Sequence, residues 1–183
     1  MKAWPLYVMV LAIWLGWCGP EWAAEGMFMD GVWYATIARN LSIGIGQGWS
    51  LQFTETLGNP FVSHPPLAFW LQSSLFSLLG DTFWVERIYS LGSVLLAGIL
   101  FWWTWILLPQ SGSKRTGWLP LLLFVSMPLV PWTTAHNMLE NTLLLTTGIS
   151  CLGWAIYLHA QRKYGLILMG LGAVLGILTK GPP

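Results

Sequence analysis

The chain has 183 residues, of which 55% are hydrophobic and only 8% are charged, whereas soluble domains carry about 25% charged residues. With 14 Trp against 8 Lys plus Arg and a net charge of +1, its few charges could not cover the surface of a water-soluble globule. The composition therefore excludes a soluble domain, a disordered chain and a nucleic-acid binder. Cys18 and Cys151 both lie in apolar runs, so no disulfide framework is indicated. We expect an all-α polytopic membrane protein.

Charged residues divide the chain into long uncharged stretches, and a spanning helix needs about 20 apolar residues. Five stretches predict spans, at residues 4–20, 86–108, 117–132, 140–158 and 164–179. The third contains three prolines, so we expect it to be short or kinked. The first stretch also fits a cleaved signal peptide, but the single Lys2 and the Trp-rich run fit an uncleaved anchor better.

The uncharged stretch 56–80 is better explained as an interfacial helix than as a span. Its helix can begin only after Pro65-Pro66 and ends at Gly80, which leaves about 14 residues. With five spans, one side of the membrane holds Lys2, Lys114, Arg115, Arg162 and Lys163, and all seven acidic residues fall on the other. By the positive-inside rule the N-terminus is cytoplasmic, and residues 21–85 form a long external segment on the membrane surface.

The external segment is predicted to contain two interfacial helices joined by a loop. Residues 30–41 indicate an amphipathic helix. Its expected apolar face consists of Val32, Ala35, Ile37, Ala38 and Leu41. Residues 42–63 are rich in Gly, Asn and Pro, which predicts a loop with short extended pieces around residues 51–53. The second helix is expected at residues 67–79, with Ser63 or His64 as its cap.

Two acidic residues stand out on the predicted external side. Asp30 lies at or just before the start of the first interfacial helix, where a carboxylate either caps free N–H groups or takes part in chemistry. Glu140 lies at the entrance to the fourth predicted span, where it either marks the topology or acts as a second acid.

A basic set lies on the same side. His64 is either a plain surface histidine or a phosphate partner, and Arg87 either pairs with Glu86 or Asp81 or faces a ligand. Lys180 runs against the positive-inside trend, which indicates an anionic partner, either a lipid phosphate or a protein carboxylate. Carboxylates and cations together at a membrane interface suit a reaction between a lipid-borne phosphate and a polar acceptor.

Five segments in order resemble the GT-C glycosyltransferases, in particular the bacterial dolichyl-phosphate-mannose–protein mannosyltransferase-like enzymes and the lipid A aminoarabinose transferases. The segments are residues 29–40, 64–72, 86–88, 135–140 and 178–182. Each segment alone is a weak match, but the ordered set is fairly specific and covers nearly the whole chain.

The resemblance implies an inverting transfer of a sugar from a polyprenyl-phosphate donor at the periplasmic face of the bacterial inner membrane. Asp30 is then the general base, and Glu140 is a second acid that orients the acceptor or, in members that use one, helps Asp30 to hold a divalent metal. The implied substrate-binding residues are Tyr34, His64, Arg87, His136 and Lys180. The acceptor, whether protein, lipid A or another glycan, is left open.

Three residues depart from the family pattern: Gly31 replaces a common Glu, Glu140 replaces Asp, and His136 replaces Arg. The chain also stops directly after the fifth predicted span, so we expect it to be the N-terminal part of a larger enzyme. The alternative function is a non-catalytic subunit for polyprenyl-lipid binding or assembly. A small transporter is disfavoured because the predicted span interiors carry no charge.

Overall fold

The computed structural model describes residues 3–56, 60–108, 116–159 and 161–181. These residues are mostly helical, which confirms the predicted all-α class, and they include one two-stranded sheet. In chain order the elements are α1 (Trp4–Ala23), α2 (Met29–Ser42), β1 (Gly46–Gln47), β2 (Ser50–Leu51), α3 (Leu67–Leu79), α4 (Trp84–Leu107), α5 (Trp118–Ser126), α6 (Leu129–Ala135), α7 (Leu139–His159) and α8 (Tyr164–Lys180).

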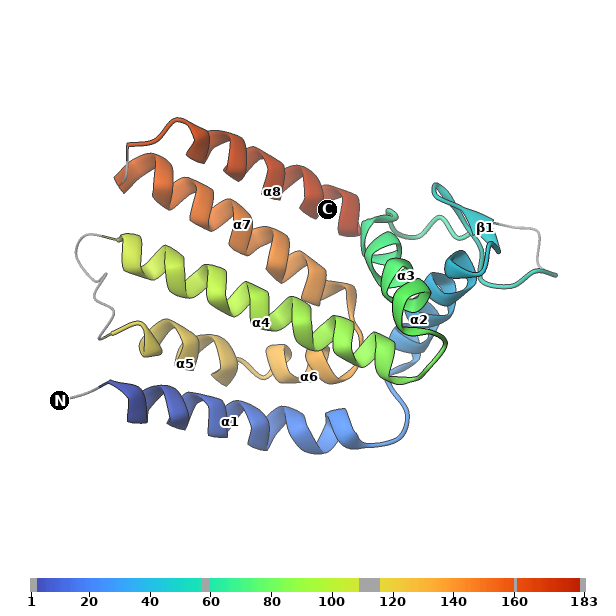
Figure 1. Cartoon of the computed structure of the whole chain (residues 1–183), viewed down its shortest axis with the longest axis horizontal. Coiled ribbons are helices and arrows are strands. Elements are labelled where there is room, and N and C mark those ends of the chain that lie inside the picture. The colour runs from blue at the N-terminus through green and yellow to red at the C-terminus, as the bar shows by residue number, and fades with distance from the viewer. Residues whose placement is uncertain (1–2, 57–59, 109–115, 160, 182–183) are drawn as a thin grey trace.

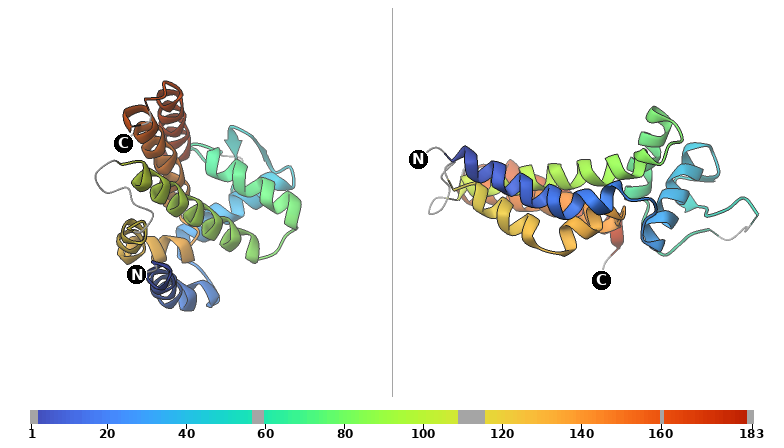
Figure 2. Two further views of the ribbon diagram at one scale, coloured as in Figure 1. Left: turned by 60° about the vertical axis from the view of Figure 1, so that its left-hand side comes forward. Right: turned by 90° about the horizontal axis from the view of Figure 1, so that it is seen from below.

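The elements form a helical bundle with a lobe at one end. Figure 1 shows α1, α4, α7 and α8 running along the bundle, with α5 and α6 between α1 and α4. Helices α2 and α3 and the short sheet form the lobe, here called the end lobe (Met29–Leu79), and both views in Figure 2 keep it at the same end. Helix α7 packs most extensively on α8 and α4. On the other side of the bundle, Val10 and Trp14 of α1 are buried against Val94, Val125 and Val130.

Three helices are long and apolar enough to cross a membrane, namely α1, α4 and α7, and they match three of the predicted spans. Helices α5 and α6 bend by 71° at their break and count as a fourth span only if taken together. The break falls at Met127, whose extended backbone is the conformation favoured before a proline such as Pro128. The fifth predicted span is a 17-residue helix, α8, so the length criterion supports three or four spans among the described residues rather than five.

Helix α8 is held close against α7 by glycines. A Cβ atom on Gly153 would lie 2.4 Å from the amide nitrogen of Met169, and one on Gly172 would lie 2.6 Å from that of Ser150. Gly153 and Gly172 therefore lie directly against the backbone of the facing helix. Side chains at these positions would force the helices apart, so the glycines fix where the end of α8 meets the end lobe.

Charge is separated along the bundle as the sequence predicts. Arg162 and Lys163 lie between α7 and α8, at the end opposite the lobe (Figure 1). Lys2, Lys114 and Arg115 lie outside the described residues. The acidic residues lie at the lobe end: Glu21, Glu25, Asp30, Glu55, Asp81, Glu86 and Glu140. The fold thus keeps the acids at the end that carries the candidate site.

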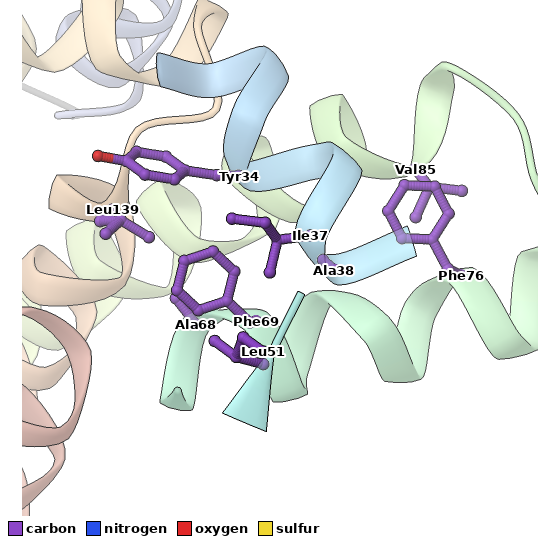
Figure 3. Close-up of a cluster of buried hydrophobic side chains, with 9 residues drawn as sticks. All are labelled: Tyr34, Ile37, Ala38, Leu51, Ala68, Phe69, Phe76, Val85 and Leu139. Atoms are coloured by element: carbon purple, nitrogen blue, oxygen red, sulfur yellow. The ribbon is translucent and has the colours of Figure 1, made fainter. Parts of the chain in front are cut away.

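The end lobe has its own core between α2 and α3 (Figure 3). Ile37 of α2 and Phe69 of α3 are fully buried, and Leu51 of β2 covers them. The predicted apolar face of α2 is confirmed at Ala35, Ile37 and Ala38, and Leu41 packs at its edge. It is wrong at Val32, which is 43% exposed, because Gly31 and Tyr34 occupy the buried stripe at that end of the helix.

Several predicted helix ends are confirmed and two caps are wrong. Helix α3 covers residues 67–79 and ends at Gly80, whose φ of 83° favours glycine, as predicted. Its N-cap is Pro66, however, with no side-chain cap from Ser63 or His64. Helix α2 begins after Phe28, so Asp30 lies in the first turn and does not cap it. The side chains of Asp30, Ser63 and His64 are therefore not used as helix caps.

Candidate functional site

Five of the seven predicted site residues gather where the end lobe meets α7 and α8. Tyr34 comes from α2, and its hydroxyl lies 3.3 Å from Nε2 of His64, which precedes α3. Glu140 begins α7 and forms an ion pair with Lys180 at the end of α8. The charges of Asp30 and Glu140 act on both Tyr34 and His64. Residues separated by more than 100 positions are thus brought into one group.

The Tyr34–His64 pair is held in its neutral form. Burial, reinforced by the charges of Asp30 and Glu140, raises the pKa of Tyr34 to about 12, so its hydroxyl stays protonated. Burial and the nearby Lys180 lower the pKa of His64, against the opposing effect of Glu140 and Asp30. The Tyr34 hydroxyl and Nε2 of His64 share one hydrogen bond, whose donor depends on the histidine tautomer, and Nδ1 of His64 is buried and unpartnered among the described residues.

Lys180 has a protein carboxylate as its anionic partner. Its Nζ atom pairs with Oε1 of Glu140, one of the two partners that the sequence left open. The cation lies in the last turn of α8 and the anion in the first turn of α7, so each is also favoured by its helix dipole. The side chains are 39% and 27% exposed, which keeps the pair in contact with solvent or ligand.

A cavity of about 680 Å³ lies directly beside this group. His64 and Lys180 line it, together with hydroxyl side chains of α7 and small residues of α8. The hydroxyls belong to Thr146, Thr147 and Ser150, and the small residues are Gly172, Ala173 and Gly176. Its volume falls within the range of small-molecule sites. The cavity is thus open to a ligand that has an anionic group at the lobe end.

Arg87 does not join this group, and of the alternatives that the sequence left open, the ion pair with Glu86 or Asp81 is not formed among the described residues. Arg87 is only 3% exposed, and its Nη2 donates to the carbonyl oxygens of Ala24 at 2.7 Å and Gly26 at 2.9 Å. Asp81 instead pairs with Arg39 at 2.5 Å. A guanidinium has several donors in a fixed plane, so it binds the carbonyls where the chain leaves α1. In this structure Arg87 is a structural clamp between that link and α4.

His136 also lies apart from the cavity. Its Nδ1 accepts the backbone N–H of Phe28 at 3.1 Å, and its Nε2 lies 3.6 Å from a carboxylate oxygen of Glu21. Phe28 is the N-cap of α2, so His136 ties the start of this helix to the end of α6. The side chain therefore holds the helix that carries Asp30, and its role in substrate binding stays a prediction.

Gly31 explains one departure from the family pattern. A Cβ atom at this position would lie 1.8 Å from the carbonyl oxygen of His136, far inside any real contact. The link between α6 and α7 therefore packs directly on the backbone of α2. No side chain fits there, so the Glu found in many relatives has no room in this fold.

Asn137 is a site-supporting residue that the sequence reasoning missed. Its Nδ2 donates to the carbonyl oxygen of Gly31 at 3.1 Å, and its Oδ1 accepts from Gln72 at 3.0 Å and Ser90 at 3.2 Å. It is 3% exposed and has a φ of 52°, which Asn tolerates better than most residues. Asn137 thus joins α2, α3 and α4 between the positions of Asp30 and Glu140. The sequence signal that could have indicated this role is an Asn in the short link between two helices.

A divalent metal does not fit the residues present. The parts of the chain that the structure describes contain no group of three or more His, Cys, Asp or Glu side chains able to hold a metal ion. Of the two acids expected to bind it, Glu140 is already paired with Lys180. We therefore derive no step through a metal.

Comparison with known proteins identifies the family. The profile of the dolichyl-phosphate-mannose-protein mannosyltransferase family matches residues 63–182, which include His64, Glu140 and Lys180. The chain is also similar to proteins named undecaprenyl phosphate-alpha-4-amino-4-deoxy-L-arabinose arabinosyl transferase. That of Aeromonas hydrophila subsp. hydrophila is 26% identical over 152 residues, which is 81% of this chain and 27% of the relative.

Two further relatives with this name show a similar level of identity. The protein of Aeromonas salmonicida is 28% identical over 154 residues, with 81% of this chain and 27% of the relative covered. The transferase 1 of Proteus mirabilis is 26% identical over 156 residues, with 83% and 27% covered. This chain therefore spans 27% of the length of the curated relatives it matches. No solved structure matches it significantly. Since the family profile covers most of the chain, the protein belongs to the dolichyl-phosphate-mannose-protein mannosyltransferase family.

Proposed function

We propose that this chain supplies the catalytic groups of a membrane glycosyltransferase, which moves a sugar from a polyprenyl-phosphate donor to an acceptor. The observation that carries the proposal is the cavity lined by His64 and Lys180, with Glu140 paired to Lys180 and the charge of Asp30 close enough to act on His64. A lysine and a histidine suit a phosphate, and a carboxylate suits the acceptor proton. The names of the relatives indicate undecaprenyl phosphate 4-amino-4-deoxy-L-arabinose as the first donor to test.

Asp30 acts as the general base in this proposal. In the described part of the structure no hydrogen bond or ion pair engages its half-buried carboxylate, whereas Glu140 is paired. An acceptor hydroxyl or amine attacks the anomeric carbon, and Asp30 takes its proton. The bond between that carbon and the phosphate oxygen breaks in line on the opposite face, so the configuration inverts. Polyprenyl phosphate leaves, and Lys180 and His64, which both line the cavity, stabilise its charge.

The end lobe faces the external, periplasmic side of the bacterial inner membrane in this proposal, and the N-terminus is cytoplasmic. Two features support this orientation. The acidic residues lie at the lobe end, and Arg162 and Lys163 lie at the opposite end, as the positive-inside rule requires. Exposed aromatic residues on the lobe, such as Trp33 and Trp49, suit contact with lipid headgroups.

A second candidate function is a non-catalytic subunit that binds polyprenyl lipid or assists assembly. It is favoured by Gly31, which leaves no room for the acid of many relatives, and by the ion pair that occupies Glu140. Such a subunit has the same cavity and binds the same lipid phosphate, but it does not turn over the donor. The two functions therefore differ only in catalysis.

The Asp30→Asn variant tests the catalytic proposal. The full chain in proteoliposomes is given the undecaprenyl-phosphate aminoarabinose donor and an acceptor lipid, and released undecaprenyl phosphate is measured by mass spectrometry. Loss of a general base should lower turnover by about 100-fold or more. The Asp81→Asn variant is the matched control, because this exposed carboxylate pairs with Arg39 and does not line the cavity. Full turnover in Asp30→Asn rejects Asp30 as the base, and lipid binding without turnover in the wild type favours the second function.

A further inference from the structure

The fixed cations at the lobe end are all engaged. Among the residues that the structure describes, Arg39 pairs with Asp81, Arg87 binds backbone carbonyls, and Lys180 pairs with Glu140. Of the three, Lys180 alone lines the cavity. His64 also lines it, but burial and Lys180 keep its pKa low. An entering phosphate therefore meets one fixed positive charge, which Glu140 already neutralises.

We infer that Lys180 exchanges partners when the donor binds, leaving Glu140 for the donor phosphate and so releasing the Glu140 carboxylate. This inference rests on the proposed function. The donor is a phosphodiester with one negative charge, so it replaces the single charge of the carboxylate one for one. An ammonium group binds as a mobile point charge with three donors, which makes such a transfer feasible.

The geometry around Lys180 permits the exchange. Its side chain is 39% exposed and ends on a flexible four-carbon stem. The backbone below it is fixed, because Gly172 and Gly153 hold α8 tightly on α7. The ammonium group can therefore move between Glu140 and the cavity without any helix moving.

The consequence is an order of events. Before the donor binds, the charge of Glu140 is neutralised, and this residue cannot orient an acceptor hydroxyl or amine. After the exchange the carboxylate is free, and it lies close enough to Tyr34 and His64 for its charge to act on both. Donor binding thus prepares the acceptor side of the site, and the donor binds first.

The test measures binding rather than catalysis, so it separates this inference from the catalytic step. Undecaprenyl methyl phosphate, a sugar-free phosphodiester with the single negative charge of the donor, is titrated into the full chain in nanodiscs, for the wild type and for Glu140→Gln, Lys180→Met and the double variant. Without the competing carboxylate, Glu140→Gln should bind the lipid about two- to fivefold more tightly, the range expected for a partly exposed ion pair. Lys180→Met should bind more weakly, and Glu140→Gln should give no gain in the Lys180→Met background.

Two further variants complete the design. Glu140→Asp keeps the charge but shortens the side chain by one methylene, so it weakens the pair and should tighten binding in the same direction even if Glu140→Gln folds poorly. Asp81→Asn releases Arg39 outside the cavity and should leave affinity unchanged.

The outcomes are distinct. A gain from Glu140→Gln that persists in the Lys180→Met background shows through-space repulsion and overturns the exchange. Equal or weaker binding by Glu140→Gln and Glu140→Asp also overturns it while leaving the proposed function standing. Absence of binding in every variant, the wild type included, overturns the proposed function and the exchange together.

Discussion

Because α2 packs directly on the link from α6 to α7 at Gly31, we expect Gly31→Ala to change the stability of the protein in an unusual direction for a helix. In an ordinary helix this change is favourable by about 1 kcal/mol, because Gly is a poor helix former. Here the added Cβ atom would lie 1.8 Å from the carbonyl oxygen of His136 and 2.9 Å from its carbonyl carbon. The substitution should therefore destabilise the protein in spite of its helix propensity.

The magnitude follows from what must move. The two backbones have to separate by at least about 1 Å to reach the closest separation that real Cβ atoms show. Such overpacking costs about 1–3 kcal/mol, and loss of the buried Asn137–Gly31 hydrogen bond adds about 1–3 kcal/mol. After subtracting the gain of about 1 kcal/mol in propensity, we expect a net loss of about 1–5 kcal/mol in the free energy of unfolding.

The assay is reversible unfolding in mixed micelles, in which added SDS melts the helices and circular dichroism follows the loss. Gly92→Ala in α4 is the matched control, since no atom of the described structure lies within 4 Å of its added Cβ. This control should be neutral or more stable by up to about 1 kcal/mol. If Gly31→Ala matches Gly92→Ala, the close contact is absent from the folded protein and the reasoning is refuted.

Two further predictions concern Arg87 and His64. Arg87→Lys should lower the free energy of unfolding by about 2–4 kcal/mol, because an ammonium group cannot satisfy the carbonyls of Trp22, Ala24 and Gly26 together. The affinity for undecaprenyl phosphate should stay unchanged. Unchanged stability together with weaker lipid binding would instead favour the predicted phosphate role of Arg87. Because the pKa of folded His64 lies below its usual 6.5, the unfolded chain binds more protons below that pH, so stability should fall as the pH is lowered through this range. His64→Gln should flatten this slope in the same SDS assay, and an unaltered slope would contradict the assignment.

Local sequence information determined most of the secondary structure. The spacing of charges placed α1, α4 and α7, since a run of about 20 apolar residues has few alternatives to a spanning helix. Pro66 and Gly80 delimited α3, and the prolines of the third predicted span signalled the break at Pro128, because both residue types restrict the backbone locally. The sequence also predicted that the acidic residues lie at one end of the bundle, because successive spanning helices place the connecting loops alternately on the two sides of the membrane.

The tertiary structure alone decided which polar side chains meet. Lys180 lies 40 positions from Glu140, and Arg87 lies 61 or more positions from the carbonyls it binds. The sequence offered each of them several partners. The choice of Lys180 depended on how closely Gly153 and Gly172 let α7 and α8 approach, and that of Arg87 on the place where the chain leaves α1 beside α4. Gly31 was read as a missing acid, whereas the fold requires it as a contact surface. Partner choice is a property of packing, which a pattern along one chain segment does not encode.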